Sequence, residues 1–289
     1  MVLTYIVERK QGFNEFLKAL DLSAKLVKSI LSKKLILING LAKAYIQDVD
    51  AKDRVQISLP EETIDDTIQH EAIPLDLIFE DAYLLIVNKP YGMPVMVTKS
   101  HPTGTLSNAL CHYYSTNHIN SKIHLVNRLD KDTSGLMIVA KNRYIKYLLS
   151  EDLKLKLHRE YYALVEGALE HKAGTIDRPI GKPEAMSMHR SIMEDGDEAV
   201  TDYRVEKEIS GISLLAITLR TGRTHQIRVH MAHLGHPIIG DKLYNPNHSK
   251  AERMMLSSHM IRFVHPITKN VIEFDLGLPD EFKNRINQG

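Results

Sequence analysis

The chain has 289 residues, of which 43% are hydrophobic and 25% charged, values typical of a soluble globular protein with one large domain or a large and a small one. Its single cysteine, Cys111, excludes an internal disulfide and a multi-cysteine zinc site. Because no apolar run is long enough to cross a bilayer and the first residues lack the apolar segment of a signal peptide, we expect a cytoplasmic protein without a membrane partner.

The net charge of +1 conceals an uneven distribution. Residues 1–60 carry ten Lys or Arg and six Asp or Glu, a net charge of +4, whereas residues 61–80 carry seven acids and no base. The rest of the chain is again +4, so an acidic segment separates two basic parts. Basic surfaces suit a polyanionic partner, although the same totals also fit ordinary surface charge.

The first sixty residues read as one small α+β unit. Apolar residues at helical spacing predict two helices within residues 12–32, with Ser23 as the N-cap of the second. Alternating residues over 34–59 predict short strands, and Asn39-Gly40 predicts a tight turn between two of them. Residues 61–74, which end in Pro74, are interpreted as an acidic linker or extended connection.

From residue 75 onward, strands and helices mix without regular alternation. Strands are predicted over 75–90 (two short ones), 134–142, 159–167 and 214–222, and helices over 104–117, 144–157 and 224–235. This order favours an α+β fold with a mixed, mostly antiparallel sheet. The predicted domains are therefore 1–60 and 75–289, joined by the linker at 61–74.

The segment "VNRLDKDTSGLMIVAKN" places charged residues at the entrance of an apolar strand. On an extended backbone Arg128 and Asp130 point the same way and Leu129 the opposite way. A nearby arginine favours the ionised form of a poorly solvated carboxylate, which can act as a nucleophile or a base. The alternative reading is a structural ion pair at a turn, which is common.

A second basic segment is "LRTGRTHQIRVHMAHLGHPIIGD", which places arginines around a predicted strand-to-helix turn at Thr221-Gly222. Cations and backbone amides at such a turn suit anions, but they also describe a basic cap on a surface helix. His230 and His233 would share one helix face, yet no carboxylate or cysteine completes a ligand set. We therefore expect these histidines to pack or to contact phosphate, and we expect no metal.

Adjacent tyrosines occupy the predicted strand "REYYALVEG". Tyr161 and Tyr162 must lie on opposite faces of a strand, so one can face a pocket while the other packs. A tyrosine in a pocket can stack on a base or move a proton, whereas two sheet-stabilising aromatics are the simpler reading.

Four segments, in this order, resemble the RluA/RluD-type family of RNA pseudouridine synthases: "NKPYGMPV", "NRLDKDTSGL", "REYYALVEG" and "LRTGRTHQIRVHMAHLGHPIIGDKLY". They lie within about residues 75–279. The N-terminal unit is similar to the small RNA-binding domain named after ribosomal small-subunit protein four, and its exposed cations are expected to bind RNA: Lys25, Lys28, Lys33 and Lys34. The family commonly has His where this chain has Asn127, which affects the orientation of the loop rather than the nucleophile.

The resemblance implies an isomerase that converts uridine in RNA to pseudouridine without metal or organic cofactor. By motif position, Asp130 is the nucleophile, Tyr161 the active-site tyrosine and Arg223 the basic residue that pairs with the aspartate. Arg128 is implied to enter the RNA when the target nucleotide flips out, with Leu129 anchoring the loop. The same resemblance gives the expected substrate contacts of the basic segment: Arg220, Thr224, His225, Gln226 and Arg228.

The expected partner is structured RNA, with large-subunit ribosomal RNA favoured over transfer RNA by analogy. No obligate protein partner is evident, and a monomer is the default expectation. Two other functions remain open at this point: an RNA-binding protein that kept the fold without catalysis, and a hydrolase built on Asp130. A hydrolase of glycosidic bonds generally uses two carboxylates, and the neighbouring Asp132 is expected to face solvent.

Overall fold

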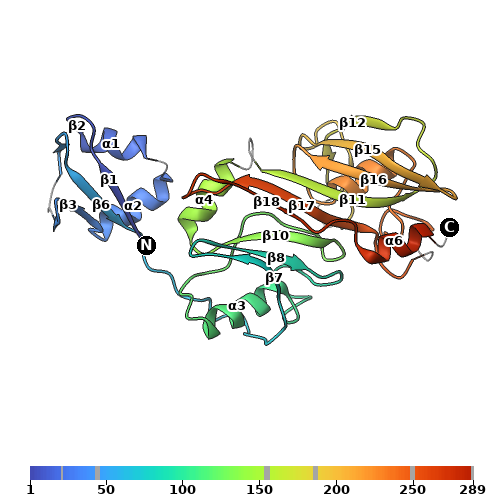
Figure 1. The fold of residues 1–289 in the computed structure, drawn as a ribbon, viewed down its shortest axis with the longest axis horizontal. Helices are drawn as coiled ribbons and strands as arrows, with labels where there is room; N and C mark the ends of the chain where they lie inside the picture. The colour runs from blue at the N-terminus through green and yellow to red at the C-terminus, as the bar shows by residue number, and fades with distance from the viewer. Residues whose placement is uncertain (21, 43–45, 153–156, 185–187, 248–250, 288–289) are drawn as a thin grey trace.

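The computed structural model describes residues 1–20, 22–42, 46–152, 157–184, 188–247 and 251–287, which form a small N-terminal unit and a larger body (Figure 1). The small unit contains β1 (Val2–Ile6), β2 (Gln11–Gly12), α1 (Phe13–Ala19), α2 (Ala24–Ser32), β3 (Ile36–Ile38), β4 (Leu41–Ala42), β5 (Asp48–Val49) and β6 (Arg54–Ser58). Its sheet has the order β1-β6-β3-β4, and β2 pairs with β5 separately.

Local signals in the sequence explain this unit. The Ser23 side chain accepts a hydrogen bond from the Leu26 amide and caps α2, as predicted. Asn39 and Gly40 have φ angles of +52° and +81°, the left-handed pair that a two-residue hairpin turn requires, so the predicted turn is confirmed. Predicted strand residues 43–45 lie outside the described part of the chain.

The larger body is built on one broad sheet. Its strands are β7 (Asp76–Glu80), β8 (Leu84–Lys89), β9 (His124–Leu125), β10 (Ser134–Ala140), β11 (His158–Glu166), β12 (Ala173–Asp177), β15 (Val200–Ile209), β16 (Ile212–Leu219), β17 (Leu256–Val264) and β18 (Val271–Asp275). The main order is β12-β15-β16-β11-β17-β10-β8-β7, with β18 beside β17 and β9 beside β10. Only the β10–β17 pair among these described strands is parallel, so the predicted mixed, mostly antiparallel sheet is confirmed.

Helices cover both faces of the sheet: α3 (Leu106–Thr116), α4 (Arg143–Asp152), α5 (Gln226–His233) and α6 (Asp280–Asn287). Successive side chains of β8 point to opposite faces of the sheet. Leu84 packs in the hydrophobic cluster that includes residues of α4, whereas Leu85 packs in the cluster that includes residues of α3 and α5. The helix predicted over 144–157 begins one residue earlier, at Arg143, and residues 153–156 lie outside the described ranges. None of the helices formed by described residues could span a membrane.

Sequence analysis assigned no element to several segments of this body. They are β9, β12, β15, β17, β18, α6 and a short hairpin of β13 (Ile180–Gly181) and β14 (Ser191–Ile192). The strand β17 sits in the middle of the sheet although it carries Ser257, Ser258 and His259, all buried. Polar residues at buried strand positions remove the apolar alternation on which the prediction relies.

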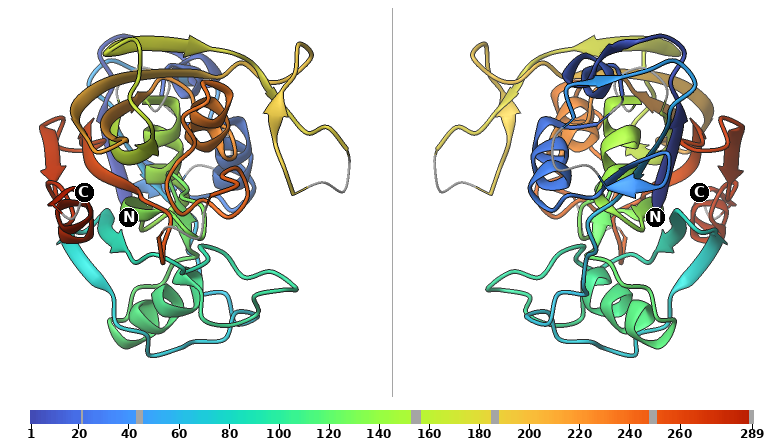
Figure 2. Two further views of the ribbon diagram at one scale, coloured as in Figure 1. Left: turned by 90° about the vertical axis from the view of Figure 1, so that its right-hand side faces the viewer. Right: turned by 90° about the vertical axis from the view of Figure 1, so that its left-hand side faces the viewer.

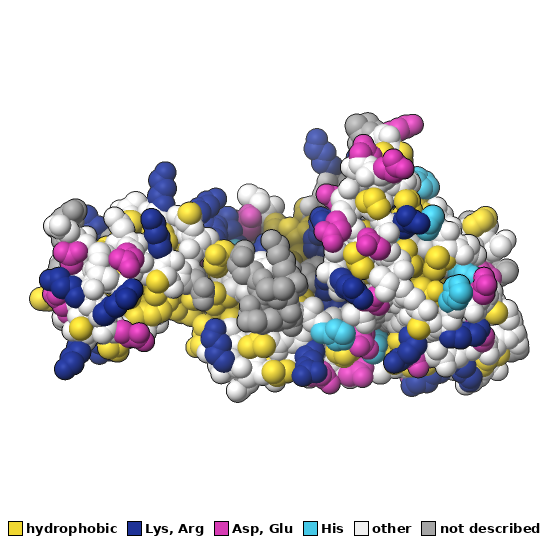
Figure 3. Space-filling view, turned by 90° about the horizontal axis from the view of Figure 1, so that it is seen from above, with side chains coloured by type: hydrophobic (Ala, Val, Ile, Leu, Met, Phe, Trp, Pro, Cys, Tyr) yellow, Lys and Arg dark blue, Asp and Glu magenta, His cyan; other side chains and the backbone are white. Residues whose placement is uncertain are grey.

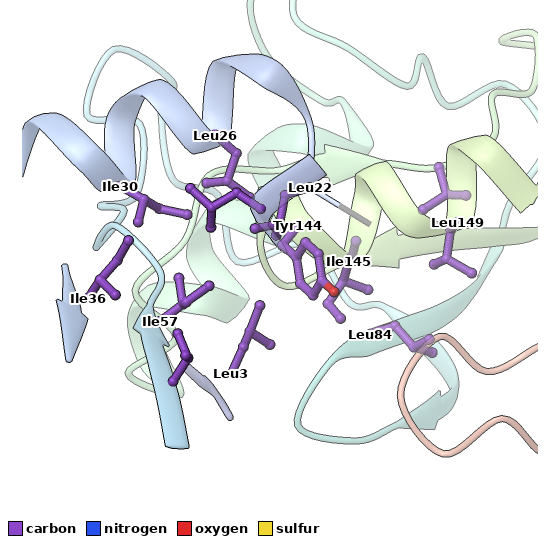
Figure 4. Packing of buried hydrophobic residues seen from close by; sticks show 14 of the residues in the cluster. Leu3, Leu22, Leu26, Ile30, Ile36, Ile57, Leu84, Tyr144, Ile145 and Leu149 are labelled. Carbon is purple, nitrogen blue, oxygen red and sulfur yellow. The ribbon is translucent and has the colours of Figure 1, made fainter. Parts of the chain in front are cut away.

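One hydrophobic cluster runs from the small unit into the body (Figure 4). Leu3, Leu22 and Leu26 belong to the same cluster as Tyr144 and Ile145 of α4. The segment after residue 60 forms no helix or strand, yet it is bonded to the body: the Glu62 carboxylate lies 2.5 Å from His124 Nε2, and the Glu71 carboxylate accepts the Gly104 amide at 2.6 Å. These contacts hold the small unit against the body.

Candidate active site

Asp130 lies on the loop that leads from β9 into β10. Leu129 beside it is buried in the core between β8, β10 and α5, so the loop is anchored and Asp130 is turned toward solvent, with 26% of its side chain exposed. The loop enters the sheet where β10 and β17 approach very closely. A Cβ atom on Gly135 would lie 2.1 Å from the Ser258 carbonyl oxygen, and φ at Gly135 is +113°, so only glycine fits there.

The buried partner of Asp130 is Arg228, in the first turn of α5. Its Nη1 donates to Asp130 Oδ2 at 3.1 Å, while Nε and Nη2 donate to the two oxygens of Asp241 at 2.8 and 2.9 Å. Burial lowers the pKa of Arg228, but its hydrogen bonds to Asp241 and the charges of Asp241 and Asp130 outweigh burial and raise it. Arg228 is therefore a permanent buried cation that donates a charged hydrogen bond to the Asp130 carboxylate.

This arrangement corrects the expected pairing of Arg223 with Asp130. Arg223 Nε donates to the Glu198 carbonyl oxygen at 2.9 Å, and Nη1 lies 3.7 Å from Asp197. The physical reason is the start of the helix: α5 begins at Gln226, so Arg223 lies before the helix and beside the cleft, whereas Arg228 points inward from its third residue.

Two further predicted substrate contacts have structural roles instead. The Gln226 side chain is 3% exposed; its oxygen accepts from Thr221 Oγ1 and the Arg223 amide, and its nitrogen donates to the Val200 carbonyl and Thr201 Oγ1. Every hydrogen-bonding atom of this amide is thus used within the protein. Arg220 forms a two-pronged pair with Asp202 at 2.6 and 2.8 Å and does not line the cleft.

Tyr161 and Tyr162 do lie on opposite sides of the sheet. Tyr161 is 4% exposed and packs in the cluster that contains Leu129, close enough to Asp130 for its charge to act on the phenol. Burial raises the pKa of Tyr161, so the phenol keeps its proton at neutral pH. Tyr162 stacks on His259 at 3.8 Å on the other side. The opposite directions expected for the two tyrosines are confirmed, and the role of Tyr161 in the site stays a prediction.

Sequence analysis missed Lys89, a fully buried lysine at the end of β8. Its ammonium donates to the carbonyl oxygens of Pro90 and Met93 at 2.9 Å and of Lys131 at 3.0 Å, so it fastens the loop that carries Asp130. Burial lowers the pKa of Lys89 to about 8, although the charges of Asp132 and Asp130 oppose the shift. A lysine directly after the apolar run "LLIVN" was the available signal.

A cleft of about 340 Å³ lies beside this loop, between the Thr221–Thr224 turn and the hairpin of β13 and β14. The hairpin stands away from the body in Figure 2 and projects at the upper right in Figure 3, where Lys and Arg side chains lie near its base. The cleft contains the predicted contacts Arg128 and Thr224. Its charged lining is four cations and one acid: Arg128, Lys182, Arg190, Arg223 and Asp197.

The histidines of α5 divide between the site and the core. His225 Nε2 lies 3.8 Å from Asp130 Oδ2, and its Nδ1 lies 2.9 Å from the Tyr244 hydroxyl. His230 is buried, with its ring nitrogens 2.9 Å from Thr201 Oγ1 and 3.0 Å from the Arg178 carbonyl oxygen. Within the described ranges, no group of three or more His, Cys, Asp or Glu side chains is arranged to hold a metal ion.

The four lysines expected to bind RNA lie on α2 and just after it. All four are exposed, and none of them forms an ion pair with another residue that the structure describes: Lys25, Lys28, Lys33 and Lys34. The structure therefore presents them as free cations on the small unit, separate from the cleft.

Comparison with known proteins gives a consistent picture. Residues 83–233, over half of the chain, match the family described as RNA pseudouridylate synthase. The uncharacterized RNA pseudouridine synthase YjbO of Bacillus subtilis (strain 168) is 38% identical over 81% of this chain and 83% of that protein. The ribosomal large subunit pseudouridine synthase D of Salmonella typhimurium is 35% identical over 92% of this chain and 86% of its own length.

The fold has a matching precedent among solved structures. The human RNA pseudouridylate synthase domain containing 4 superposes with a TM-score of 0.60 at 22% identity, covering 73% of this chain and 92% of that one. At this identity the likeness concerns the arrangement of the elements alone. It supports the α+β architecture that the residue patterns predicted.

Proposed function

Since the chain belongs to the RNA pseudouridylate synthase family and is an isomerase of uridine in RNA, we propose that it flips a uridine of large-subunit ribosomal RNA into the cleft and uses Asp130 as the nucleophile. The observation that carries the proposal is the pairing of Asp130 with Arg228, a buried cation at 3.1 Å, two residues along the chain from Arg128, which lines the cleft with three other cations.

Base flipping follows from the partial burial of Asp130, whose side chain is 26% exposed. A glycosidic bond inside a base-paired stem cannot reach a carboxylate that is enclosed to this extent, and extruding a nucleotide costs a few kcal/mol. Arg128 is exposed, lines the cleft and is separated from Asp130 only by the buried Leu129. Its long side chain is therefore placed to fill the gap left in the RNA while Asp130 meets the extruded nucleotide.

The reaction requires an ionised carboxylate, whether it attacks ribose C1′ or the uracil ring. The N1–C1′ bond breaks and its electron pair leaves with uracil. After the ring turns, C5 bonds to C1′, the bond formed by the Asp130 carboxylate breaks, the C5 proton is lost and N1 gains a proton. The RNA keeps its composition, so no co-reactant is consumed. We propose that Tyr161 stacks on the uracil, because its raised pKa keeps the phenol protonated and so unable to accept the C5 proton.

Two observations support ribosomal RNA as the substrate. A relative covering 92% of this chain is named for the ribosomal large subunit. The free lysines of α2 offer a second contact surface apart from the cleft, which a large structured RNA can reach. We further propose that the protein acts as a monomer in the cytoplasm, where ribosomes work.

The test is carbodiimide-dependent primer extension on ribosomal and transfer RNA from cells that lack the protein, restored with wild type, Asp130→Asn or Asp132→Asn. We expect one or more large-subunit sites to vanish without the protein, return with wild type and with Asp132→Asn, and stay absent with Asp130→Asn. Asp132 is the matched control because it is a carboxylate on the same loop.

Other outcomes would indicate a different substrate, nucleophile or reaction. A changed site in transfer RNA would replace the substrate, and a site restored by Asp130→Asn would refute the nucleophile. If no site changes and the purified protein binds RNA without converting it, the protein is a binding module. Release of free uracil would instead indicate a hydrolase.

A further inference from the structure

A second side chain of the described site points at the space beside Asp130 without reaching it. His225 is the N-cap of α5 and holds a left-handed backbone, with φ of +60° and ψ of +18°, an uncommon conformation for a residue other than glycine. Its Nε2 lies 3.8 Å from Asp130 Oδ2, too far for a hydrogen bond. The imidazole thus borders the position that a flipped uridine must occupy, with 17% of its side chain exposed.

The other ring nitrogen fixes which tautomer faces the cleft. The Tyr244 hydroxyl oxygen accepts the Arg190 amide at 2.8 Å and lies 2.9 Å from His225 Nδ1. We assign the phenol proton to a hydrogen bond with Nδ1, which leaves the hydrogen of a neutral imidazole on Nε2. The opposite tautomer would place the Nε2 lone pair toward the Asp130 carboxylate, an unfavourable contact.

The surroundings keep this imidazole neutral. Burial lowers the pKa of His225, the charges of Arg228 and Arg190 lower it further, and the charges of Asp130 and Asp241 act in the opposite direction. The Tyr244 ring is itself held in place, because the Arg228 guanidinium lies 5.1 Å from its centre. The result is a neutral N–H donor of fixed direction next to the proposed nucleophile.

We propose that His225 is a catalytic residue that donates its Nε2 hydrogen to a carbonyl oxygen of the uracil while the ring is detached from the ribose, and that Tyr244 is the positioning residue that sets its tautomer. Uracil that leaves with the electron pair of the N1–C1′ bond carries negative charge shared among N1, O2 and O4. A fixed donor aimed at one of these oxygens stabilises the detached ring more than the bound uridine. This inference rests on the proposed function.

The test replaces the acceptor as well as the donor. RNA fragments containing the mapped target are synthesised with uridine, 2-thiouridine or 4-thiouridine at that position, because sulfur accepts a hydrogen bond more weakly than oxygen. Single-turnover conversion is followed by digestion and chromatography of the nucleosides. The variants are His225→Asn, Tyr244→Phe, the double variant, and His233→Asn as an exposed control on the same helix. Asparagine is chosen because it tolerates a left-handed backbone.

We expect wild type and His233→Asn to convert one of the two thio substrates about tenfold more slowly than uridine. His225→Asn should convert the uridine substrate about 10- to 100-fold more slowly, bind it within about twofold of wild type, and show no added penalty from sulfur. Tyr244→Phe should slow conversion in the wild-type background and have no further effect beside His225→Asn, since it acts through His225.

The opposite results are equally clear. A sulfur penalty of full size in His225→Asn, or no penalty from either sulfur in wild type, would overturn the role of His225 and leave the proposed function standing. Additive effects of the two substitutions would overturn the role of Tyr244. A wild-type enzyme that converts none of the substrates, uridine included, would overturn the proposed function and this inference together.

Discussion

The buried ion pair of Arg228 and Asp241 makes a quantitative prediction about stability and turnover. Arg228→Met leaves Asp241, which is 1% exposed, without its two charge-assisted hydrogen bonds. Asp241→Asn keeps the acceptor for the Leu243 and Tyr244 amides but leaves Arg228 with Asp130 alone. Breaking a buried pair costs about 3–5 kcal/mol, so each single variant should lose about that much free energy of unfolding.

The double variant separates stability from catalysis. It leaves neither charge buried without its partner, so its loss of unfolding free energy should be smaller than the sum of the single losses by at least about 2 kcal/mol. Its turnover should stay as low as that of Arg228→Met, because Asp130 lacks its cation in both. Urea unfolding followed by circular dichroism measures the free energy of unfolding, and tritium release from RNA labelled at uracil C5 measures turnover.

A matched control exists on the same sheet. Arg220 and Asp202 form a fork of similar geometry, but the Arg220 side chain is 61% exposed. The same cycle there should give a coupling of no more than about 1 kcal/mol and leave turnover unchanged. Additive losses for Arg228 and Asp241, or turnover restored in their double variant, would refute the reasoning.

Three further predictions follow from single contacts. The pKa of Lys89 is 10.5 in the unfolded chain and about 8 in the folded protein, so the unfolded chain binds more protons between these pH values. In urea titrations, the free energy of unfolding of wild type should therefore rise by up to about 3 kcal/mol relative to that of Lys89→Met as the pH rises from 8 to 10.5. A difference that does not change with pH would contradict this. Gly135→Ala should lower the free energy of unfolding by about 3 kcal/mol or more. Gly211→Ala, where φ is +78° but a Cβ atom would meet open space, should lower it by only about 1 kcal/mol. Equal losses in thermal unfolding would refute the steric argument. Lys28→Ala should weaken RNA binding and reduce the slope of log K against log salt by about 0.9, with turnover at saturation unchanged.

The parts of the site that depend on neighbouring residues could be predicted from the sequence. The alternation of Arg128, Leu129 and Asp130 fixed which side chain is buried, and the turn residues before β10 placed the loop at a strand entrance. The opposite directions of Tyr161 and Tyr162 followed from the geometry of any strand. These inferences needed only local backbone geometry, which the chain specifies over a few residues.

The partner of Asp130 could not be chosen in this way. Arg223 and Arg228 lie five residues apart, and which one faces inward depends on the residue at which α5 begins, the least certain feature of a pattern-based prediction. The pairing also joins positions 98 residues apart in the chain. One signal was present. Arg228 is flanked by the apolar Ile227 and Val229, and an arginine that is buried among such residues needs an acidic partner; Asp241 directly follows the apolar "PII" and Gly240.

The charged residues of the site therefore form two sets with different roles, a buried set and an exposed set. The buried set of Asp241, Arg228 and Asp130 holds the Asp130 carboxylate in place through Arg228, but its net negative charge would repel an incoming phosphate. The exposed cations of the cleft, from Arg128 to Arg223, offset that repulsion where the RNA backbone must pass. Substitutions in the buried set should consequently lower turnover at saturating RNA. Substitutions in the exposed set should raise the RNA concentration needed for saturation and make that concentration less sensitive to salt.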